Sequence, residues 1–171
     1  MQLTDRTWKE FPVQNLFSIR GIPKKEPSDF AGNGPYPLIS AKTINNGVMG
    51  FFDDYDTKGN CLVVETSCDG HCTYQKENFS GHGHLAVLRP KNFELNDAVA
   101  LFLVTVMNAG CINYNYGRKC SIARLKKRTI PLPVECDTEN PDWKFMKDFM
   151  RSLLKSGTKR CSFELMFQWV D

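Results

Sequence analysis

LKKRTIPLPVECDTENPDWKFMKDFM, residues 125–150, joins an extended segment to a helix. In Ile130–Val134, apolar residues alternate with two prolines, which cannot donate the hydrogen bonds that a central strand requires. We therefore predict an edge strand or an extended connection there. A helix is predicted to begin at Asn140, because Pro141 suits the first helical position and the apolar residues that follow are three or four positions apart.

The predicted C-terminal helix carries an apolar stripe that requires a cover. The stripe could pack on its own domain or on a second helix from a twin chain or a further domain, and its width favours some of both. Gly157 is expected to end or bend the helix. Beyond it, apolar residues at every second position from Cys161 to Trp169 predict a strand. The residues assigned to partner packing are Trp143, Met146, Phe149, Met150 and Leu153.

Further upstream the sequence predicts a buried helix among short strands. Ala98–Met107 is apolar on nearly all sides, with Asn96 as its N-cap and Gly110 at its end. Asn46-Gly47 predicts a hairpin turn, because both residues tolerate a positive φ. Strands are predicted at Trp8–Phe11, Tyr36–Ala41, Cys61–Glu65 and His84–Arg89.

The composition is that of a soluble globular chain. The 171 residues are 42% hydrophobic and 24% charged, enough for one domain, with or without an appendage. No apolar run reaches the roughly 18 residues of a membrane span, and the N-terminus lacks the apolar core of a signal peptide. We expect a cytoplasmic protein without membrane contact. Its seven scattered cysteines are expected to be free, mostly buried thiols.

Positive charge is concentrated in one segment. Arg118–Arg128 carries six basic residues and no acidic ones. Since the chain holds 22 basic and 19 acidic residues, the remainder has 22 − 6 = 16 basic against 19 acidic residues. A mildly acidic protein with one basic segment is typical of a nucleic-acid contact, and also of an ordinary solvated face.

A metal site is a weaker interpretation of the stretch Ser67–Leu85. Zinc could use Cys68, Cys72, His82 and His84 as ligands. The gap of three residues between the cysteines is not the usual two, and two histidines in alternate positions of a strand would point to opposite faces. The favoured interpretation is therefore a loop followed by a strand, with no metal.

No catalytic constellation is evident. The sequence lacks a Gly-x-Ser-x-Gly nucleophile elbow and a glycine-rich phosphate loop that ends in Lys-Ser or Lys-Thr. We expect a protein that is not itself an enzyme and that needs no cofactor.

The order of several motifs resembles the target recognition domain of type I restriction-modification specificity subunits. These motifs are YPLISAKTINNGV from Tyr36, TYQKENFSGHGHLAVLRP from Thr73 and LKKRTIPLPV from Leu125, followed by the proline-started helix. The similarity covers roughly residues 8 to 154. It implies an α+β fold with curved, partly barrel-like sheets, a buried helix and a C-terminal spacer-type helix. The expected division is a recognition domain over 1–138 and a helix with tail over 139–171.

The resemblance also implies a function. Such domains read one half of a split target in double-stranded DNA without catalysis. They dock onto a methyltransferase subunit that holds S-adenosylmethionine, and in the full complex onto a restriction subunit. This chain has one recognition domain and a short spacer helix. It could therefore be a half-subunit that forms a homodimer through the C-terminal helix, a truncated or split product, or a stand-alone protein.

Residues for DNA contact follow from their chemistry. Lysine and arginine bind phosphates, whereas asparagine and arginine can read base edges. The segment Ile112–Lys119 is the first choice, although its tyrosines could instead pack and its asparagines cap. The predicted DNA-binding residues are Lys42, Asn45, Lys76, Tyr114, Asn115, Tyr116, Arg118, Lys119 and Arg124. The alternative function is a stand-alone or zinc-stabilised interaction module, such as an inhibitor or decoy of a restriction complex.

Overall fold

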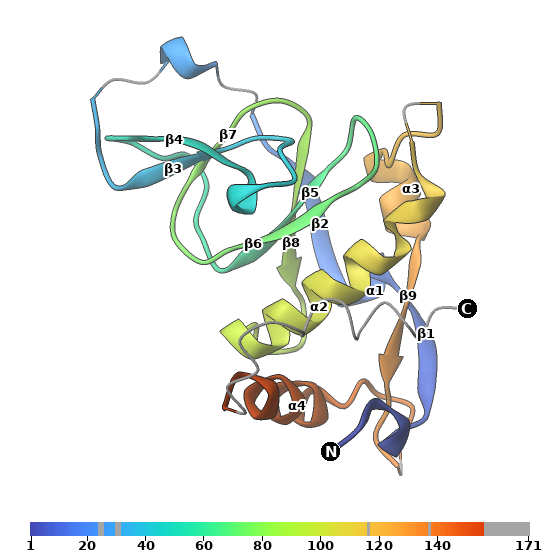
Figure 1. Ribbon diagram of the computed structural model, residues 1–171. Coiled ribbons are helices and arrows are strands. Elements are labelled where there is room, and N and C mark those ends of the chain that lie inside the picture. Colours follow the sequence, from blue (N-terminus) through green and yellow to red (C-terminus); the bar gives the residue numbers. More distant parts are fainter. Residues whose placement is uncertain (24–25, 30–31, 116, 137, 156–171) are drawn as a thin grey trace.

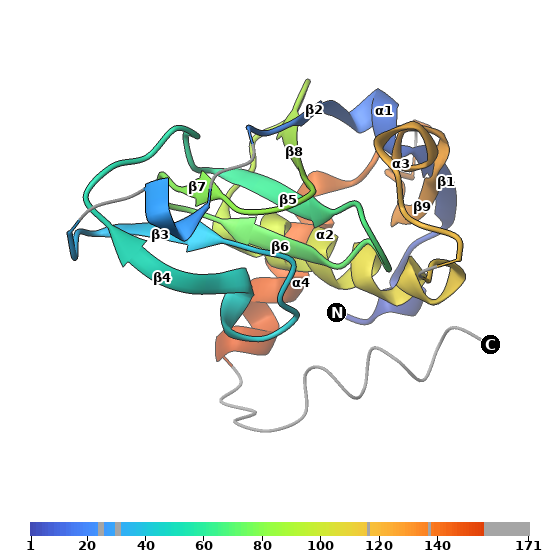
Figure 2. The same ribbon diagram turned by 90° about the horizontal axis from the view of Figure 1, so that it is seen from above.

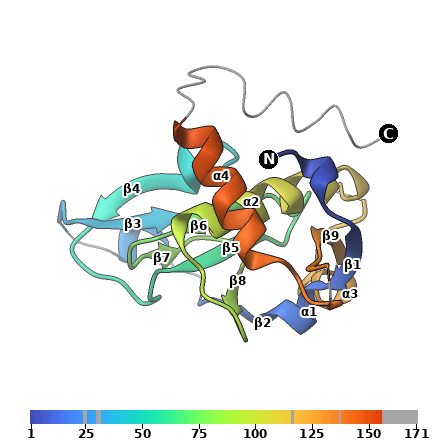
Figure 3. The same ribbon diagram turned by 90° about the horizontal axis from the view of Figure 1, so that it is seen from below.

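The computed structural model describes residues 1–23, 26–29, 32–115, 117–136 and 138–155, and its main body has three layers. A four-stranded sheet lies on one side of the helix α2 (Asp97–Ala109), and α4 (Trp143–Lys155) lies on the other side (Figure 1). Figure 3 shows α4 crossing α2 on the side away from the sheet. The helix α2 is thus covered on two sides, as its largely apolar sequence predicts, and Leu101 is its exposed apolar residue.

The described residues form three sheets. The four-stranded sheet has the order β2-β8-β5-β6 and is antiparallel throughout. Its strands are β2 (Phe17–Gly21), β5 (Cys61–Glu65), β6 (Cys72–Gln75) and β8 (Leu85–Pro90). The second sheet has the order β4-β3-β7, from β3 (Tyr36–Ile39), β4 (Val48–Phe52) and β7 (Ser80–Gly81). In Figure 2 this second sheet extends to the side of the molecule opposite β1 and β9. The fold is α+β, as expected, and the described residues form no closed barrel.

The predicted proline-containing strand is confirmed as an edge element. It is β9 (Thr129–Pro133), which within the described ranges pairs with β1 (Trp8–Pro12) alone, in an antiparallel two-stranded sheet. Directly after β1, the Val13 amide donates a hydrogen bond of 2.8 Å to the Arg128 carbonyl. This bond ties the N-terminal strand to the end of the basic segment.

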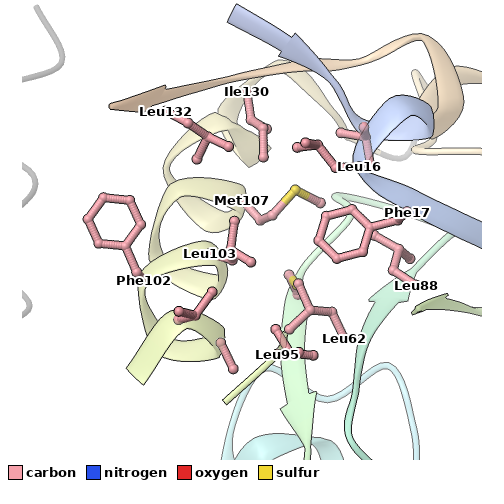
Figure 4. Close-up of a cluster of buried hydrophobic side chains, with 14 of the residues drawn as sticks. Leu16, Phe17, Leu62, Leu88, Leu95, Phe102, Leu103, Met107, Ile130 and Leu132 are labelled. Carbon is pink, nitrogen blue, oxygen red and sulfur yellow. The ribbon is translucent and has the colours of Figure 1, made fainter. Parts of the chain in front are cut away.

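The main core is built around α2. Figure 4 shows Phe102, Leu103 and Met107 of α2 between β-strand side chains on one side and Leu132 of β9 on another. Phe102, Leu103 and Leu62 are fully buried. The predicted N-cap is confirmed, since the Asn96 side chain accepts a hydrogen bond from the Val99 amide, and Gly110 follows the last helical residue.

The C-terminal helix starts later than its sequence predicts. It begins at Trp143 rather than Asn140, because Asp142 caps it: the Asp142 carboxylate accepts a hydrogen bond of 2.8 Å from the Phe145 amide. Pro141 instead bridges to Val134 in extended backbone. Proline is tolerated both in the first turn of a helix and in extended backbone. The start of α4 is therefore set by the Asp142 cap and not by Pro141. The end of the predicted helix at Gly157, and the strand predicted from Cys161 to Trp169, lie outside the described residues.

The apolar stripe of α4 is covered by this chain itself. Met146, Phe149 and Met150 are buried in the main core. The Phe149 ring meets the edge of Phe102 at 6.4 Å between centroids. Trp143 stacks on Phe93 at 3.9 Å, and Leu153 packs against the same core. The structure therefore places the predicted partner-packing side chains within this domain, and Leu154 next to them is 66% exposed.

The sequence interpretation missed several short elements. Two are helices, α1 (Val13–Leu16) and α3 (Ile122–Lys127), and the others are the 3-10 turns η1 (Leu3–Asp5), η2 (Pro27–Asp29), η3 (Asn45–Gly47) and η4 (Gly110–Asn113). The turn at Asn46-Gly47 has the expected positive φ angles of 53° and 79°. It does not join two strands directly, because β3 ends at Ile39 and a longer loop intervenes. Among the described residues no helix is long and apolar enough to cross a membrane.

Candidate nucleic-acid interface

Four loop segments meet on one surface, which we call the loop face: residues 40–47, 66–71, 82–84 and 111–120 without residue 116. Backbone hydrogen bonds join them in series. The His82 amide bonds to the Ile39 carbonyl at 2.7 Å, the Thr66 amide to the His84 carbonyl at 2.9 Å, and the Cys120 amide to the Cys68 carbonyl at 3.0 Å. In Figure 1 the loop from β5 to β6 and the helix α3 lie in the upper half, whereas α4 lies at the bottom.

A buried carboxylate shapes the loop between β5 and β6. Glu65 is 4% exposed. Its carboxylate accepts hydrogen bonds from the Ser67 amide and hydroxyl and, at 2.8 Å, from the Cys68 amide. Since a buried carboxylate is costly unless it is hydrogen-bonded, this set of donors fixes the path of the loop.

Gly70 allows this loop to contact the segment between α2 and α3. Its φ is 80°, and a Cβ atom there would lie only 2.6 Å from the Cys120 sulfur. The Cys111 thiol also donates a hydrogen bond of 3.1 Å to the Gly70 carbonyl. Any larger residue at position 70 would separate the two loops.

The loop after η4 projects as a tight turn with charged residues at its end. Asn115 and Arg118 form an isolated antiparallel bridge, and the Asn115 side chain also accepts a hydrogen bond of 2.9 Å from the Arg118 amide. The side chains of Asn115, Arg118 and Lys119 are exposed. This turn therefore presents an amide and two cations on a defined backbone. Tyr116, another predicted contact, lies outside the described residues.

The basic segment divides into exposed and structural residues. The predicted contact Arg124 is exposed, with one guanidinium nitrogen 2.8 Å from the Lys119 carbonyl, so it braces the turn just described. Arg128 turns inward instead. Its guanidinium bonds to the Met107 carbonyl and lies 5.8 Å from the centre of the Tyr114 ring. Tyr114 is half-buried, and burial raises the pKa of its hydroxyl.

Two predicted contacts lie on another part of the loop face. Lys42 and Asn45 are both exposed in the segment after β3. Lys42 lines a small cavity together with Glu65 and His71, which places this segment beside the loop between β5 and β6. The structure thus brings together Lys42, Asn45 and the turn at Arg118 as parts of one continuous loop surface.

Lys76 is engaged in an ion pair. It follows the end of β6 to which the segment 40–47 is also bonded, since the Asn46 side chain donates a hydrogen bond to the Tyr74 carbonyl. Its ammonium group forms an ion pair of 2.7 Å with Asp97, and the hydrogen bond to Asp97 raises the pKa of Lys76. The Tyr74 hydroxyl donates a hydrogen bond of 3.2 Å to the same carboxylate. Desolvation, and to a smaller extent the charge of Asp97, raise the pKa of Tyr74 to about 12.

The geometry does not gather the alternative zinc ligands. Within the described ranges, no group of three or more histidine, cysteine, aspartate and glutamate side chains could hold a metal ion. Cys72 is fully buried in the main core, and burial raises its thiol pKa strongly, which disfavours the thiolate that zinc requires. His84 is exposed, and His82 lies 3.4 Å from the Glu26 carboxylate. The described part of the chain therefore does not bring these four residues together as a group of metal ligands.

Three residues that organise the loop face had no clear signal in the sequence. Glu65 reads as the last residue of a strand, Gly70 as an ordinary turn glycine, and Arg128 as one more cation. Their roles depend on partners 2 to 50 positions away, and only the fold shows those partners.

Comparison with known proteins identifies the family. Residues 5–160 match the family described as "Type I restriction modification DNA specificity domain". A relative from Heyndrickxia coagulans, "Type II restriction enzyme BgcI specificity subunit S.BcgI", is 30% identical over 155 residues, which are 86% of this chain and 44% of that protein.

Solved structures share the fold. The S subunit of a type I restriction-modification system from M. genitalium has a TM-score of 0.62 at 16% identity, over 91% of this chain and 40% of that chain. A chain from a structure described as showing "complex assembly" and conformational transition of the type I R-M system has a TM-score of 0.58 at 14% identity, over 87% of this chain and 38% of that chain. This chain spans less than half the length of these relatives. The motif resemblance is confirmed: the chain belongs to the family of type I restriction-modification DNA specificity domains.

Proposed function

We propose that this chain recognises a specific sequence in double-stranded DNA, as the specificity subunit or half-subunit of a restriction-modification complex. The observation that carries this proposal is the family match over residues 5–160. The loop face supports it, because exposed cations and amide side chains from separate segments lie there on one surface. Proteins that read DNA need cations for phosphates and amide or guanidinium groups for base edges.

The roles divide by chemistry. Lys42, Lys119 and Arg124 suit phosphate contact, because their charges are exposed on the loop face. Asn45 suits the reading of base edges, since an asparagine amide can bond to adenine through two groups. The Asn115 oxygen already accepts a hydrogen bond from the Arg118 amide, so Asn115 suits contact through its NH2 group. Arg118 stands at the end of the turn and suits either role. Tyr114 is assigned to support, because Arg128 covers its ring.

Lys76 is assigned a structural rather than a DNA-binding role. Its ion pair with Asp97 holds its ammonium group beside the first turn of α2. Tyr116 remains a proposed contact by virtue of its place in the sequence between Asn115 and Arg118.

The chain performs no chemistry itself under this proposal and needs no cofactor of its own. It brings a methyltransferase subunit, which holds S-adenosylmethionine, and in the full complex a restriction subunit to the target. This complex would act in the cytoplasm. The exposed Leu154 near the end of α4 suits contact with another helix, in a homodimer or on a partner subunit.

Two measurements test the proposal together. Binding of the full chain to a library of random duplexes, with and without a co-expressed methyltransferase partner, should enrich one sequence. Affinity for that duplex should fall steeply as salt rises, because phosphate contacts release counterions. Enrichment of no sequence under both conditions would contradict DNA recognition. A stable complex with the methyltransferase but no duplex binding would instead indicate an inhibitor or decoy.

A further inference from the structure

One apolar side chain on the loop face is unusually exposed. Ile44 is 67% exposed, the highest value among the exposed large hydrophobic residues of the described chain. A single exposed hydrophobic residue is common and needs no explanation by itself. The loop that carries Ile44 gives it significance.

That loop is held rigidly. The Gly47 amide donates a hydrogen bond of 3.0 Å to the Ile44 carbonyl, and the Ser40 amide donates one of 2.9 Å to the Gly47 carbonyl. The Asn46 side chain bonds to the Tyr74 carbonyl at 2.8 Å, and the Gln75 amide group bonds to the Asn46 carbonyl at 2.9 Å. Hydrogen bonds to β6 therefore hold this loop in place.

The residues of this loop also suit its backbone. Asn45, Asn46 and Gly47 have consecutive φ angles of 51°, 53° and 79°. Asparagine and glycine adopt this left-handed region at lower cost than other residues. Local preference and the surrounding hydrogen bonds together hold Ile44 in a defined place.

The neighbours of Ile44 are polar and suited to DNA. Lys42 lies two positions before it, Asn45 follows it directly, and both are exposed. Lys42 also lines the cavity beside Glu65 and His71, so this loop continues the surface formed by the loop between β5 and β6. An isoleucine placed there can read only an apolar group, because its side chain has no hydrogen-bond donor or acceptor. In the major groove of DNA, the apolar group on a base edge is the 5-methyl group of thymine.

We propose that Ile44 is a specificity-determining residue that contacts the 5-methyl group of one thymine in the target. This inference rests on the proposed DNA recognition and adds one base preference to it. Replacement of that thymine by deoxyuridine removes the methyl group alone. Affinity should then fall about fourfold, the equivalent of one methyl group returned to water.

The test couples the side chain to the methyl group. With the enriched duplex, each thymine is replaced singly by deoxyuridine, and binding is measured for the wild-type chain, Ile44→Ala and Ile44→Val. Wild type should show the loss at one position at least. Ile44→Ala should bind the thymine duplex more weakly and lose nothing further on deoxyuridine substitution, and Ile44→Val should retain part of the effect. Leu154→Ala, an equally exposed apolar site on α4, should behave as wild type.

The failures are distinguishable. If no duplex is enriched, the proposed function fails and the inference fails with it. If the duplex binds but wild type tolerates deoxyuridine at every position, only the inference fails. If Ile44→Ala weakens binding yet keeps full thymine dependence, Ile44 does not read a methyl group, and an apolar wedge between base pairs is indicated instead.

Discussion

The guanidinium of Arg128 donates a hydrogen bond to the backbone carbonyl of Met107, in the last turn of α2. A cation at a helix C-terminus is favourable, because the carbonyls there carry partial negative charge. A Cβ atom on Gly110 would lie 2.4 Å from the same guanidinium, so glycine makes room for it. Arg128, one member of the basic segment, thus links the last turn of α2 to the start of β9.

Arg128→Ala should therefore reduce stability more than it affects phosphate contacts. We expect a loss of about 2 kcal/mol in the free energy of unfolding, typical of a hydrogen bond to a charged group. Urea unfolding measures it. Arg128→Lys should recover part of the loss, since it keeps the charge without the planar fork. The neighbouring exposed Lys127→Ala is the matched control and should change stability by less than about 0.5 kcal/mol. Equal losses of stability in Arg128→Ala and Lys127→Ala would contradict this structural role of Arg128.

Arg118→Ala combined with Lys119→Ala should weaken DNA binding without lowering stability, the opposite of Arg128→Ala. Both side chains are exposed at the end of the loop turn, so the unfolding midpoint should stay unchanged. Duplex affinity should fall, and the slope of log affinity against log salt should decrease by about 2 if both cations neutralise phosphates. Lys144→Ala with Lys147→Ala on α4 removes the same charge at the far end of the molecule. If this control weakens binding equally, net charge rather than the loop face governs affinity.

The contrast between Arg118 and Arg128 shows how far the sequence can predict this fold and its site. Strands such as Cys61–Glu65 and the buried helix follow from local patterns of apolar residues and caps, and both are confirmed. The basic segment is visible in the sequence as a concentration of charge. Its division into inward and outward side chains depends on Met107, which is 21 positions from Arg128 and becomes its partner only in the folded chain.

Asn108 completes the exposed edge of β6. Cys72 faces Val64 of β5 in the register, and its amide and carbonyl point the other way. The Asn108 side chain accepts a hydrogen bond of 2.7 Å from that amide and donates one of 3.0 Å to that carbonyl. Asn108→Ala should lower the free energy of unfolding by about 1–3 kcal/mol, because two backbone groups lose their partner. Asn108→Asp keeps the acceptor oxygen but loses the NH2 donor. Its free energy of unfolding should therefore lie between those of the wild type and Asn108→Ala. If urea unfolding gave the same free energy for Asn108→Ala as for the wild type, water would replace both hydrogen bonds without cost.

Burial should protect the core thiols from modification. Cys61, Cys72 and Cys120 are fully buried, and Cys136 is exposed. Desolvation raises the pKa of Cys61 and of Cys120 to about 11, so little thiolate forms at pH 8. Cys161 lies outside the described residues, so it is first replaced by serine. In that variant, Ellman's reagent should modify Cys136 rapidly and the three buried thiols only after unfolding. Rapid modification of Cys72 in the native protein would contradict the core packing.

The same thiols give a pH dependence of stability with a definite sign. In the unfolded chain a thiol ionises near its ordinary pKa of about 8.5, whereas folded Cys61 stays protonated until about pH 11. Between these values the unfolded state binds fewer protons, so stability falls as pH rises. Cys61→Ala should make the fall in urea midpoint between pH 8.5 and 10.5 shallower. An unchanged slope would mean that this thiol does not contribute.

The α4 stripe decides between a helix that serves its own domain and one that serves a partner. Phe149 is 7% exposed and packs edge-on against Phe102, so Phe149→Ala should lower the free energy of unfolding by about 3–5 kcal/mol even in a monomer. Leu154→Ala, at 66% exposure, should leave monomer stability unchanged but weaken any association through α4. Urea unfolding at two protein concentrations, with sedimentation velocity, separates the two effects. If Phe149→Ala instead abolished association and left monomer stability intact, α4 would be held by the partner. The contacts with α2 would then contribute little to the stability of this domain.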